Sequence, residues 1–277
     1  MKLRYTAAWV GFTAAALVAT SACSAESVKD TAEAVDKTDA IMAALTRATD
    51  RTEQTGSAEI KVTTDLGTGT PIAMDGTYSW GDGIAYDVRM DTAAAQMQTV
   101  QDDPTIHCLL VDGVYYYDVD PQASGPLKGK EWMKVDASAV FGENGAAAMN
   151  GGGGGNPTAS MKGLKYADDV EDLGSQTVNG QKTTHYRAVI DQSKMGKFEE
   201  AYTGDDSMLG SVTGGADSIT MEIWLDDKDL PVRLKQVMGK VTATMDFSEF
   251  GATAKIKAPP AAETADMTQA LKDSQGQ

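Results

Sequence analysis

Cysteine and histidine are scarce in this sequence. The 277 residues include only Cys23, Cys108, His107 and His185 of these two types. A secreted domain that depends on disulfides carries more cysteines, so a disulfide framework is excluded as the basis of the fold. Two histidines on separate predicted strands give a weak case for a metal site. We therefore expect no cofactor, no metal and no catalytic residue, with Cys108 a buried inert thiol and His185 a solvent-facing strand residue.

The common catalytic motifs are also lacking. The sequence has no Gly-x-Ser-x-Gly, no Ser-x-x-Lys and no His-Glu-x-x-His, so nothing supports a hydrolase. Five glycines at 151–155 are not followed by Gly-Lys-Ser/Thr, which excludes a phosphate-binding loop and predicts a flexible Gly-rich loop at 142–156. The acidic stretch Asp226–Asp229 lacks the spacing of a calcium loop and indicates a hairpin turn.

Basic residues are in the minority. The chain has 24 Lys and Arg against 40 Asp and Glu, which gives a formal net charge of −16. A protein that binds nucleic acid must neutralise phosphates with basic side chains, so that class of partner is excluded. The same charge argues against docking on anionic lipid headgroups by electrostatics alone. It is typical of a protein that stays soluble at a crowded surface.

The apolar run near the N-terminus, residues 7–18, is too short to span a bilayer permanently. Lys2 and Arg4 precede it, and the small residues Ser21 and Ala22 follow it directly before Cys23. This order is typical of a lipoprotein signal peptide over residues 1–22, although Thr20 stands where an aliphatic residue is usual. Cleavage would leave Cys23 as the first mature residue, carrying acyl chains such as palmitate.

That lipid would anchor a secreted cell-envelope protein to the extracytoplasmic face of the cell membrane, since two or more acyl chains give stable attachment. Residues 24–37 are polar, acidic and free of aromatic side chains, so 23–37 is predicted to be the lipidated cysteine and a flexible tether. The remaining residues, 38–277, are enough for a single domain with a sizeable core. We expect this domain to be a monomer.

Helical periodicity is limited to three segments. The first runs from Thr38 to about Gln54, with Thr38 as its cap and an apolar stripe at helical spacing. A second helix is predicted to open at Asn156 and Pro157, because proline suits the first helical turn. A third is predicted over residues 193–202.

Elsewhere the period is two, which predicts about ten strands. The clearest are residues 218–225, 231–238 and 240–247, and Asp112-Gly113 marks a tight hairpin turn. Short strands joined by short turns make the sheet antiparallel, and the alternation makes it one-sided. The fold class is therefore α+β, with a large curved antiparallel sheet whose concave face is covered by a few helices.

Several ordered motifs resemble one known family. They are Asn156-Pro157 through Leu164, Asp172-Leu173-Gly174, residues 178–186, the hairpin Ile223-Trp224-Leu225-Asp226 with Leu230-Pro231-Val232-Arg233, and the closing segments 247–251 and 256–260. Together they are similar to LolA-like lipoproteins, and most of all to the LppX/LprAFG group of actinobacterial cell-envelope lipoproteins. The resemblance implies a half-open β-barrel around an apolar cavity that holds lipid or glycolipid acyl chains.

The function expected on this basis is binding, and transfer, of such lipids by a non-enzymatic anchored lipoprotein. The alternative is a structural or sensory surface lipoprotein whose sheet binds a protein partner. The methionines predicted to point inward have two explanations. They fill the core in the ordinary way, or they form a flexible cavity lining that adapts to varied acyl chains. The candidate cavity-lining residues are Ile41, Leu45, Ile60, Val62, Tyr86, Val88, Met133, Leu164, Phe198, Met221, Ile223, Leu225, Val232, Leu234, Met245 and Phe247.

Overall fold

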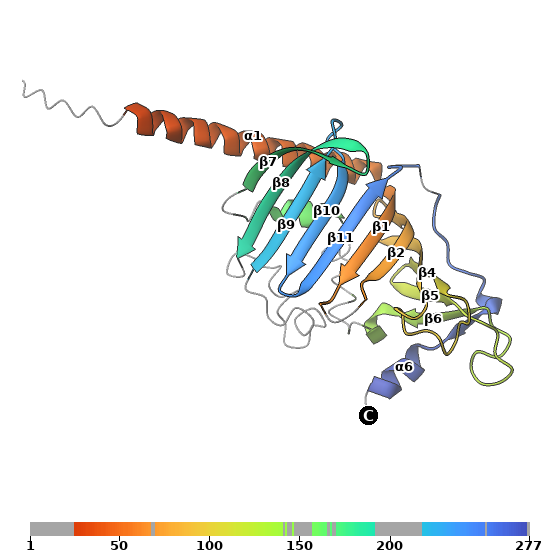
Figure 1. The fold of residues 1–277 in the computed structure, drawn as a ribbon. Helices are drawn as coiled ribbons and strands as arrows, with labels where there is room; N and C mark the ends of the chain where they lie inside the picture. The colour runs from red at the N-terminus through yellow and green to blue at the C-terminus, as the bar shows by residue number, and fades with distance from the viewer. Residues whose placement is uncertain are drawn as a thin grey trace, which may run out of the picture. The chain divides into compact units, whose positions relative to one another are not determined.

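The computed structural model describes residues 25–67, 70–140, 142, 146, 157–164, 167, 170–191, 218–252 and 254–275. The chain divides into two compact units, Met1–Lys37 and Thr38–Gln277. The larger unit is built on one open, curved sheet of twelve strands in the order β12-β6-β5-β4-β3-β2-β1-β11-β10-β9-β8-β7 (Figure 1). The strands are β1 (Ser57–Asp65), β2 (Ile72–Ser79), β3 (Ala85–Asp91), β4 (Thr105–Val111), β5 (Val114–Asp118), β6 (Trp132–Asp136), β7 (Val170–Val178), β8 (Gln181–Asp191), β9 (Ser218–Leu225), β10 (Pro231–Met238), β11 (Val241–Ser248) and β12 (Thr264–Asp266).

Neighbouring strands are antiparallel, except that β12 runs parallel to β6. Tight turns hold the hairpins. Asp112 and Gly113 both have positive φ, 51° and 75°, as a two-residue hairpin turn requires. Asn179 and Gly180 repeat the pattern between β7 and β8, with φ of 50° and 78°. The predicted fold class, including the Asp-Gly turn, is confirmed.

The helices whose bounds fall within the described residues are α1 (Ala25–Thr55), α3 (Pro157–Gly163) and α6 (Thr268–Gln275), with a short 3-10 turn η3 (Ala261–Glu263). Residues 137–140 are also helical. α1 begins at Ala25, well before the predicted start at Thr38, and so includes much of the predicted tether. Residues 25–37 contain neither glycine nor proline, so nothing in them interrupts a helix. Among the described residues, no helix is both long enough and apolar enough to cross a membrane.

The core lies between one face of the sheet, called here the inner face, and the helices α1 and α3. Leu45 and Ala48 of α1 and Met161 of α3 belong to the same buried cluster as the inner-face side chains of the strands. Trp80, just after β2, donates a hydrogen bond from Nε1 to the carbonyl of Thr52 at 2.9 Å. This bond fixes the last turn of α1 against the sheet.

Some predicted elements lie outside the described residues. They include the third helix at 193–202 and most of the Gly-rich loop at 142–156, in which positions 142 and 146 are described and helical. The strands β7 and β12 and the helix α6 were not predicted. β7 is an edge strand whose central residues are mostly exposed, so its sequence lacks the apolar alternation that marks a half-buried strand.

Candidate functional site

The inner face carries an unbroken apolar row because the strand registers align its side chains. Ile60 faces Phe247, and Val62 faces Met245 across the β1–β11 pair. Leu234 of β10 continues the Met245 row, and Ile223 of β9 lies opposite Leu234. Side chains opposite one another in a sheet share a face, so the row crosses four strands without a polar break.

Most candidate cavity residues lie in this one cluster with α1 and α3. Those buried in it or packed against it are Ile41, Leu45, Ile60, Val62, Tyr86, Val88, Leu164, Met221, Ile223, Leu225, Leu234, Met245 and Phe247. These thirteen side chains therefore belong to one apolar cluster, and their role in lining a cavity stays a prediction.

Three candidates lie elsewhere. Met133 of β6 is on the inner side of its strand but belongs to a separate cluster with Val119, Leu127 and Ala265. Val232 packs instead with Val178 and Trp224, because the β9–β10 register shifts between Pro231 and Arg233 and breaks the alternation. Its predicted place on the inner face is wrong. Phe198 lies outside the described residues.

Several inner-face side chains are only partly buried. They are Met74, Met90, Tyr86, Tyr117 and Met245, which pack against the cluster yet keep accessible surface. Their neighbours Val88 and Cys108 are 1% and 0% exposed. These five side chains are therefore less tightly enclosed than a closely packed core residue.

The inner face of β3, β4 and β5 differs chemically from that of β9 to β11. It carries Tyr86, Tyr115, Tyr117 and the free thiol of Cys108, which is fully buried as predicted. The rings of Tyr115 and Tyr117 stack at 6.2 Å, and those of Tyr86 and Tyr115 are 6.1 Å apart. Burial raises the pKa of Tyr115 and that of Cys108 to about 12, so both stay protonated at neutral pH.

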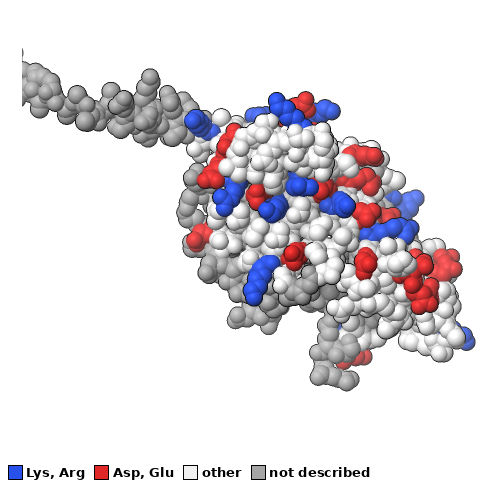
Figure 2. All heavy atoms as spheres, in the orientation of Figure 1, with Lys and Arg blue, Asp and Glu red and all other residues white. Residues whose placement is uncertain are grey.

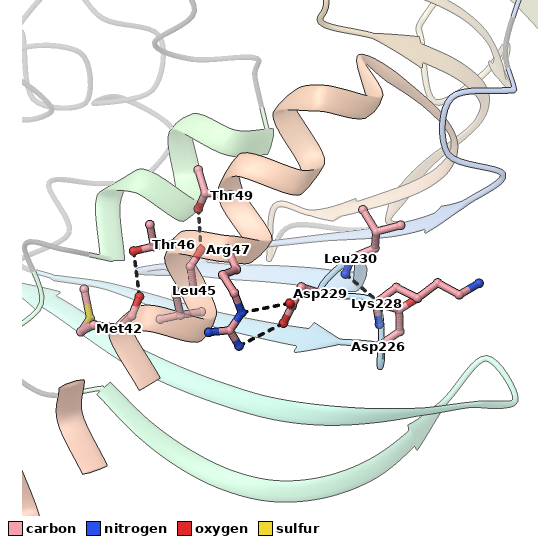
Figure 3. Close-up of polar contacts among 9 residues, drawn as sticks. All are labelled: Met42, Leu45, Thr46, Arg47, Thr49, Asp226, Lys228, Asp229 and Leu230. Carbon is pink, nitrogen blue, oxygen red and sulfur yellow. Dashed lines mark hydrogen bonds and ion pairs between the residues drawn. The ribbon is translucent and has the colours of Figure 1, made fainter. Parts of the chain in front are cut away.

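α1 contacts the turn between β9 and β10, which lies toward the β7 edge of the sheet and away from β3 to β5 (Figure 3). Arg47 reaches both carboxylate oxygens of Asp229, at 3.1 and 3.4 Å. Asp226 shapes that turn by accepting hydrogen bonds from the backbone N–H groups of Lys228 and Leu230. The acidic stretch is therefore a hairpin turn, as predicted, and it also holds the helix.

The outer face of the sheet is charged in both signs (Figure 2). Arg233 forms a bidentate pair with Asp246 across β10 and β11, at 2.6 and 2.9 Å. Lys235 reaches Glu222 at 3.0 Å. Paired charges in cross-strand positions keep this face solvated and stabilise the register, which leaves the inner face as the apolar surface of the sheet.

His185 is an exception on the outer face. Only 4% of its surface is exposed to solvent, so the prediction of a solvent-facing histidine is wrong. The imidazole stacks on Trp224 with ring centroids 4.1 Å apart, and Nε2 lies 2.9 Å from a Glu222 oxygen. His107 instead pairs with Asp87 at 2.6 Å on a half-exposed part of this face. Within the described part of the chain, no group of three or more His, Cys, Asp or Glu could hold a metal ion.

No family model matches the sequence. A Streptomyces coelicolor protein named "Putative lipoprotein SCO4650" is 26% identical over 243 residues, which are 84% of this chain and 77% of the relative. An uncharacterized 31.2 kDa protein of Streptomyces griseus is 25% identical over 249 residues, covering 83% of this chain and 80% of the relative.

Among solved structures, the open curved sheet is similar in fold to two mycobacterial lipoproteins. Lipoprotein LppX of Mycobacterium tuberculosis superposes with a TM-score of 0.51 at 13% identity, covering 79% of this chain and 99% of LppX. LprF of Mycobacterium bovis gives a TM-score of 0.51 at 14% identity, covering 79% and 96%. The resemblance to the LppX/LprAFG group indicated by the sequence motifs is confirmed, as a likeness of fold.

Proposed function

We propose that this chain is a non-enzymatic, lipid-anchored lipoprotein of the cell envelope that binds acyl chains of a lipid or glycolipid between the sheet and helices α1 and α3. The apolar inner face offers hydrocarbon side chains from several strands, and burial of each ligand methylene there contributes about 0.8 kcal/mol. Within the described residues, charged side chains of β10 and β11 lie on the opposite face.

The proposal rests mainly on the partial solvent accessibility of the inner-face side chains. Met74, Met90 and Met245 pack against the inner-face cluster and are still partly accessible. Unbranched thioether side chains adjust to ligands of different shape at little cost. An interior with accessible methionines suits an acyl chain better than it suits a rigid polar ligand.

The anchor belongs to the same proposal. Cys23 lies outside the described residues, and its lipidation is supported by the signal pattern before it and by the name of the Streptomyces coelicolor relative. On this proposal the protein is a monomer held on the extracytoplasmic face of the membrane, where it takes up and transfers lipid. Residues 24–37 then act as the spacer between Cys23 and the larger unit.

The test is to fill the interior from one strand. Ala243 is partly accessible on the inner face of β11, opposite Gln236 and Thr64, whereas the next residue, Thr244, lies on the outer face. We expect Ala243→Phe to weaken binding of a fluorescent C16 fatty acid at least tenfold, because the added ring occupies the space of about five or six chain carbons.

Thr244→Phe is the matched control, since it adds a ring one residue away on the other face. It is expected to leave acyl binding unchanged. Equal binding by both variants and the wild type would place the ligand elsewhere. An absence of binding to the wild type would favour a surface lipoprotein that recognises a protein partner.

A further inference from the structure

We propose that the interior contains a hydroxyl-binding subsite made by Tyr86, Tyr115, Tyr117 and Cys108, which receives an oxygen-bearing group of the bound lipid. The inference rests on the proposed function and adds the class of ligand. It is a lipid with a hydroxyl or ester positioned inside the protein, so its recognised part is not hydrocarbon alone.

Strand register brings these four groups together. Tyr86 of β3 lies opposite Leu110 of β4, and Leu110 lies opposite Tyr115 of β5. One step along the same strands, Cys108 lies opposite Tyr117. The four side chains therefore share the inner face over three adjacent strands, and they form one polar area on it.

The groups are hydrogen bonded to one another. The Tyr86 hydroxyl bonds to that of Tyr115, the Tyr117 hydroxyl bonds to the Cys108 thiol, and Cys108 Sγ lies 4.0 Å from Tyr86 Oη. A phenol has one donor and two acceptor positions, and a thiol is a weak partner. The Tyr117 hydroxyl in particular has a better partner in an alcohol or carbonyl oxygen than in sulfur.

The cluster is neutral and suits neutral oxygen groups. Burial is the largest cause of the raised pKa of each phenol and of the thiol, so none of them ionises near neutral pH. A neutral phenol both donates and accepts hydrogen bonds, which matches an alcohol or an ester. No basic side chain belongs to the cluster, so a carboxylate or phosphate has no counter-charge there.

Accessibility separates the groups that a ligand can reach from those that support them. Tyr86 and Tyr117 retain surface, while Leu110 is 2% exposed and Cys108 is fully buried. Burying hydroxyl groups is costly compared with burying phenyl rings, so an interior for hydrocarbon alone would be served better by phenylalanine at both positions.

The experiment removes hydroxyls without removing rings. The full chain with Cys23→Ala as common background is loaded with the apolar fluorophore N-phenyl-1-naphthylamine, which is then displaced by 1-dodecanol or by dodecane. Tyr86→Phe with Tyr117→Phe is compared with the unsubstituted background, and each single change is measured as well. Tyr116→Phe is the control, because Tyr116 pairs with Leu109 and Lys134 on the outer face of the same strand.

The expected result is a fivefold to tenfold loss of dodecanol affinity in the double variant, about the value of one or two hydrogen bonds, with dodecane affinity unchanged. Tyr116→Phe is expected to change neither. Unchanged dodecanol affinity, or an equal loss for both ligands, would overturn the subsite and leave the proposed function standing. If neither ligand displaces the fluorophore from the unsubstituted protein, the proposed function fails, and the subsite with it.

Discussion

Trp224 organises one end of the outer face of the sheet. Its ring stacks on His185, packs against Val178 and Val232, and donates from Nε1 to Gln176 Oε1 at 2.9 Å. His185 in turn shares Glu222 with Lys235. This small cluster joins β7, β8, β9 and β10 on the face opposite the proposed ligand.

Truncation of Trp224 tests that role. We expect Trp224→Ala to lower the free energy of unfolding by about 3 kcal/mol, since the change removes a buried ring and leaves His185 without its stacking partner. Urea denaturation measures the loss. Trp132→Ala is the control, because Trp132 is only partly buried and contacts His107 edge-on. A loss no greater than that of Trp132→Ala would contradict the role given to Trp224.

Two carboxylates give the protein a defined acid sensitivity. Hydrogen bonds from Ser138 lower the pKa of Asp136, and those from Thr268 lower the pKa of Asp266, both from an ordinary value of 3.8. A lowered pKa in the folded state stabilises the protein above the pKa of the unfolded state. That stability is lost as the pH falls below about 4 and through the folded-state pKa.

The expected outcome is a melting temperature that falls between about pH 4 and pH 2 in the wild type and falls less in Asp136→Asn with Asp266→Asn. Asparagine keeps an oxygen for the same backbone N–H groups, at Ser138 and Thr268, but does not titrate. Thermal melting in a pH series provides the measurement. Parallel curves for the two proteins would show that these carboxylates do not set the acid limit.

For single residues, a feature could be predicted from the sequence only where its cause is local. The Asp112-Gly113 turn was predictable because two adjacent residues fix it, and the burial of Cys108 followed from the apolar run around it. The burial of His185 was not, because it depends on Trp224 in another strand and on a register shift at Pro231. Nothing in the sequence of β8 itself indicates that Trp224 covers His185.

Strand β2 depends on a glycine at a position where its backbone lies very close to that of β3. Gly76 has φ of 145° and lies on the inner face opposite Ile60 and Val88. A Cβ at this position would lie 2.2 Å from the backbone oxygen of Asp87 in β3. The oxygen belongs to the strand backbone, so it cannot move aside without opening the β2–β3 pair.

We therefore expect Gly76→Ala to destabilise the protein by at least about 2 kcal/mol more than Gly83→Ala does. Gly83 is a suitable control because its φ is also positive, at 107°, while a Cβ there meets nothing within 4 Å. Differential scanning calorimetry of the two variants measures the difference. Similar melting temperatures would mean that β2 and β3 can separate without cost.

The helix α1 is held against the sheet mainly by buried apolar side chains, and its ion pair with Asp229 contributes less. The side chains of Arg47 and Asp229 are 58% and 36% exposed, so their pair contributes at most about 1 kcal/mol. Leu45 and Ala48 are 2% and 0% exposed, and their burial supplies most of the attachment. The stripe that predicted them was readable from sequence, whereas the extension of α1 back to Ala25 was not.

For the whole molecule, the alternation of apolar and polar residues was sufficient to predict a one-sided curved antiparallel sheet. The edges were the part that could not be predicted. β7 is largely exposed and β12 has only three residues, so neither has the apolar period that identifies a strand. Both take their strand conformation from the neighbour they pair with, which is a tertiary effect.

On the proposed function, the lipid on Cys23 attaches the whole protein to the membrane. We expect Cys23→Ala to release the protein from the membrane fraction while its thermal stability stays within about 0.5 kcal/mol of the wild type, because residue 23 lies outside the larger unit. Fractionation and melting curves test both parts. Ser24→Ala is the control, and membrane attachment of Cys23→Ala would refute the lipid anchor.

On the proposed function, the interior of the larger unit holds a lipid. The most direct test is to purify the protein from its native host and to analyse it by native mass spectrometry, with organic extraction of the same sample. We expect at least one lipid per protein molecule, carrying acyl chains and an oxygen-bearing group, and reduced occupancy in Ala243→Phe. A lipid-free protein that also takes up no acyl probe would contradict it.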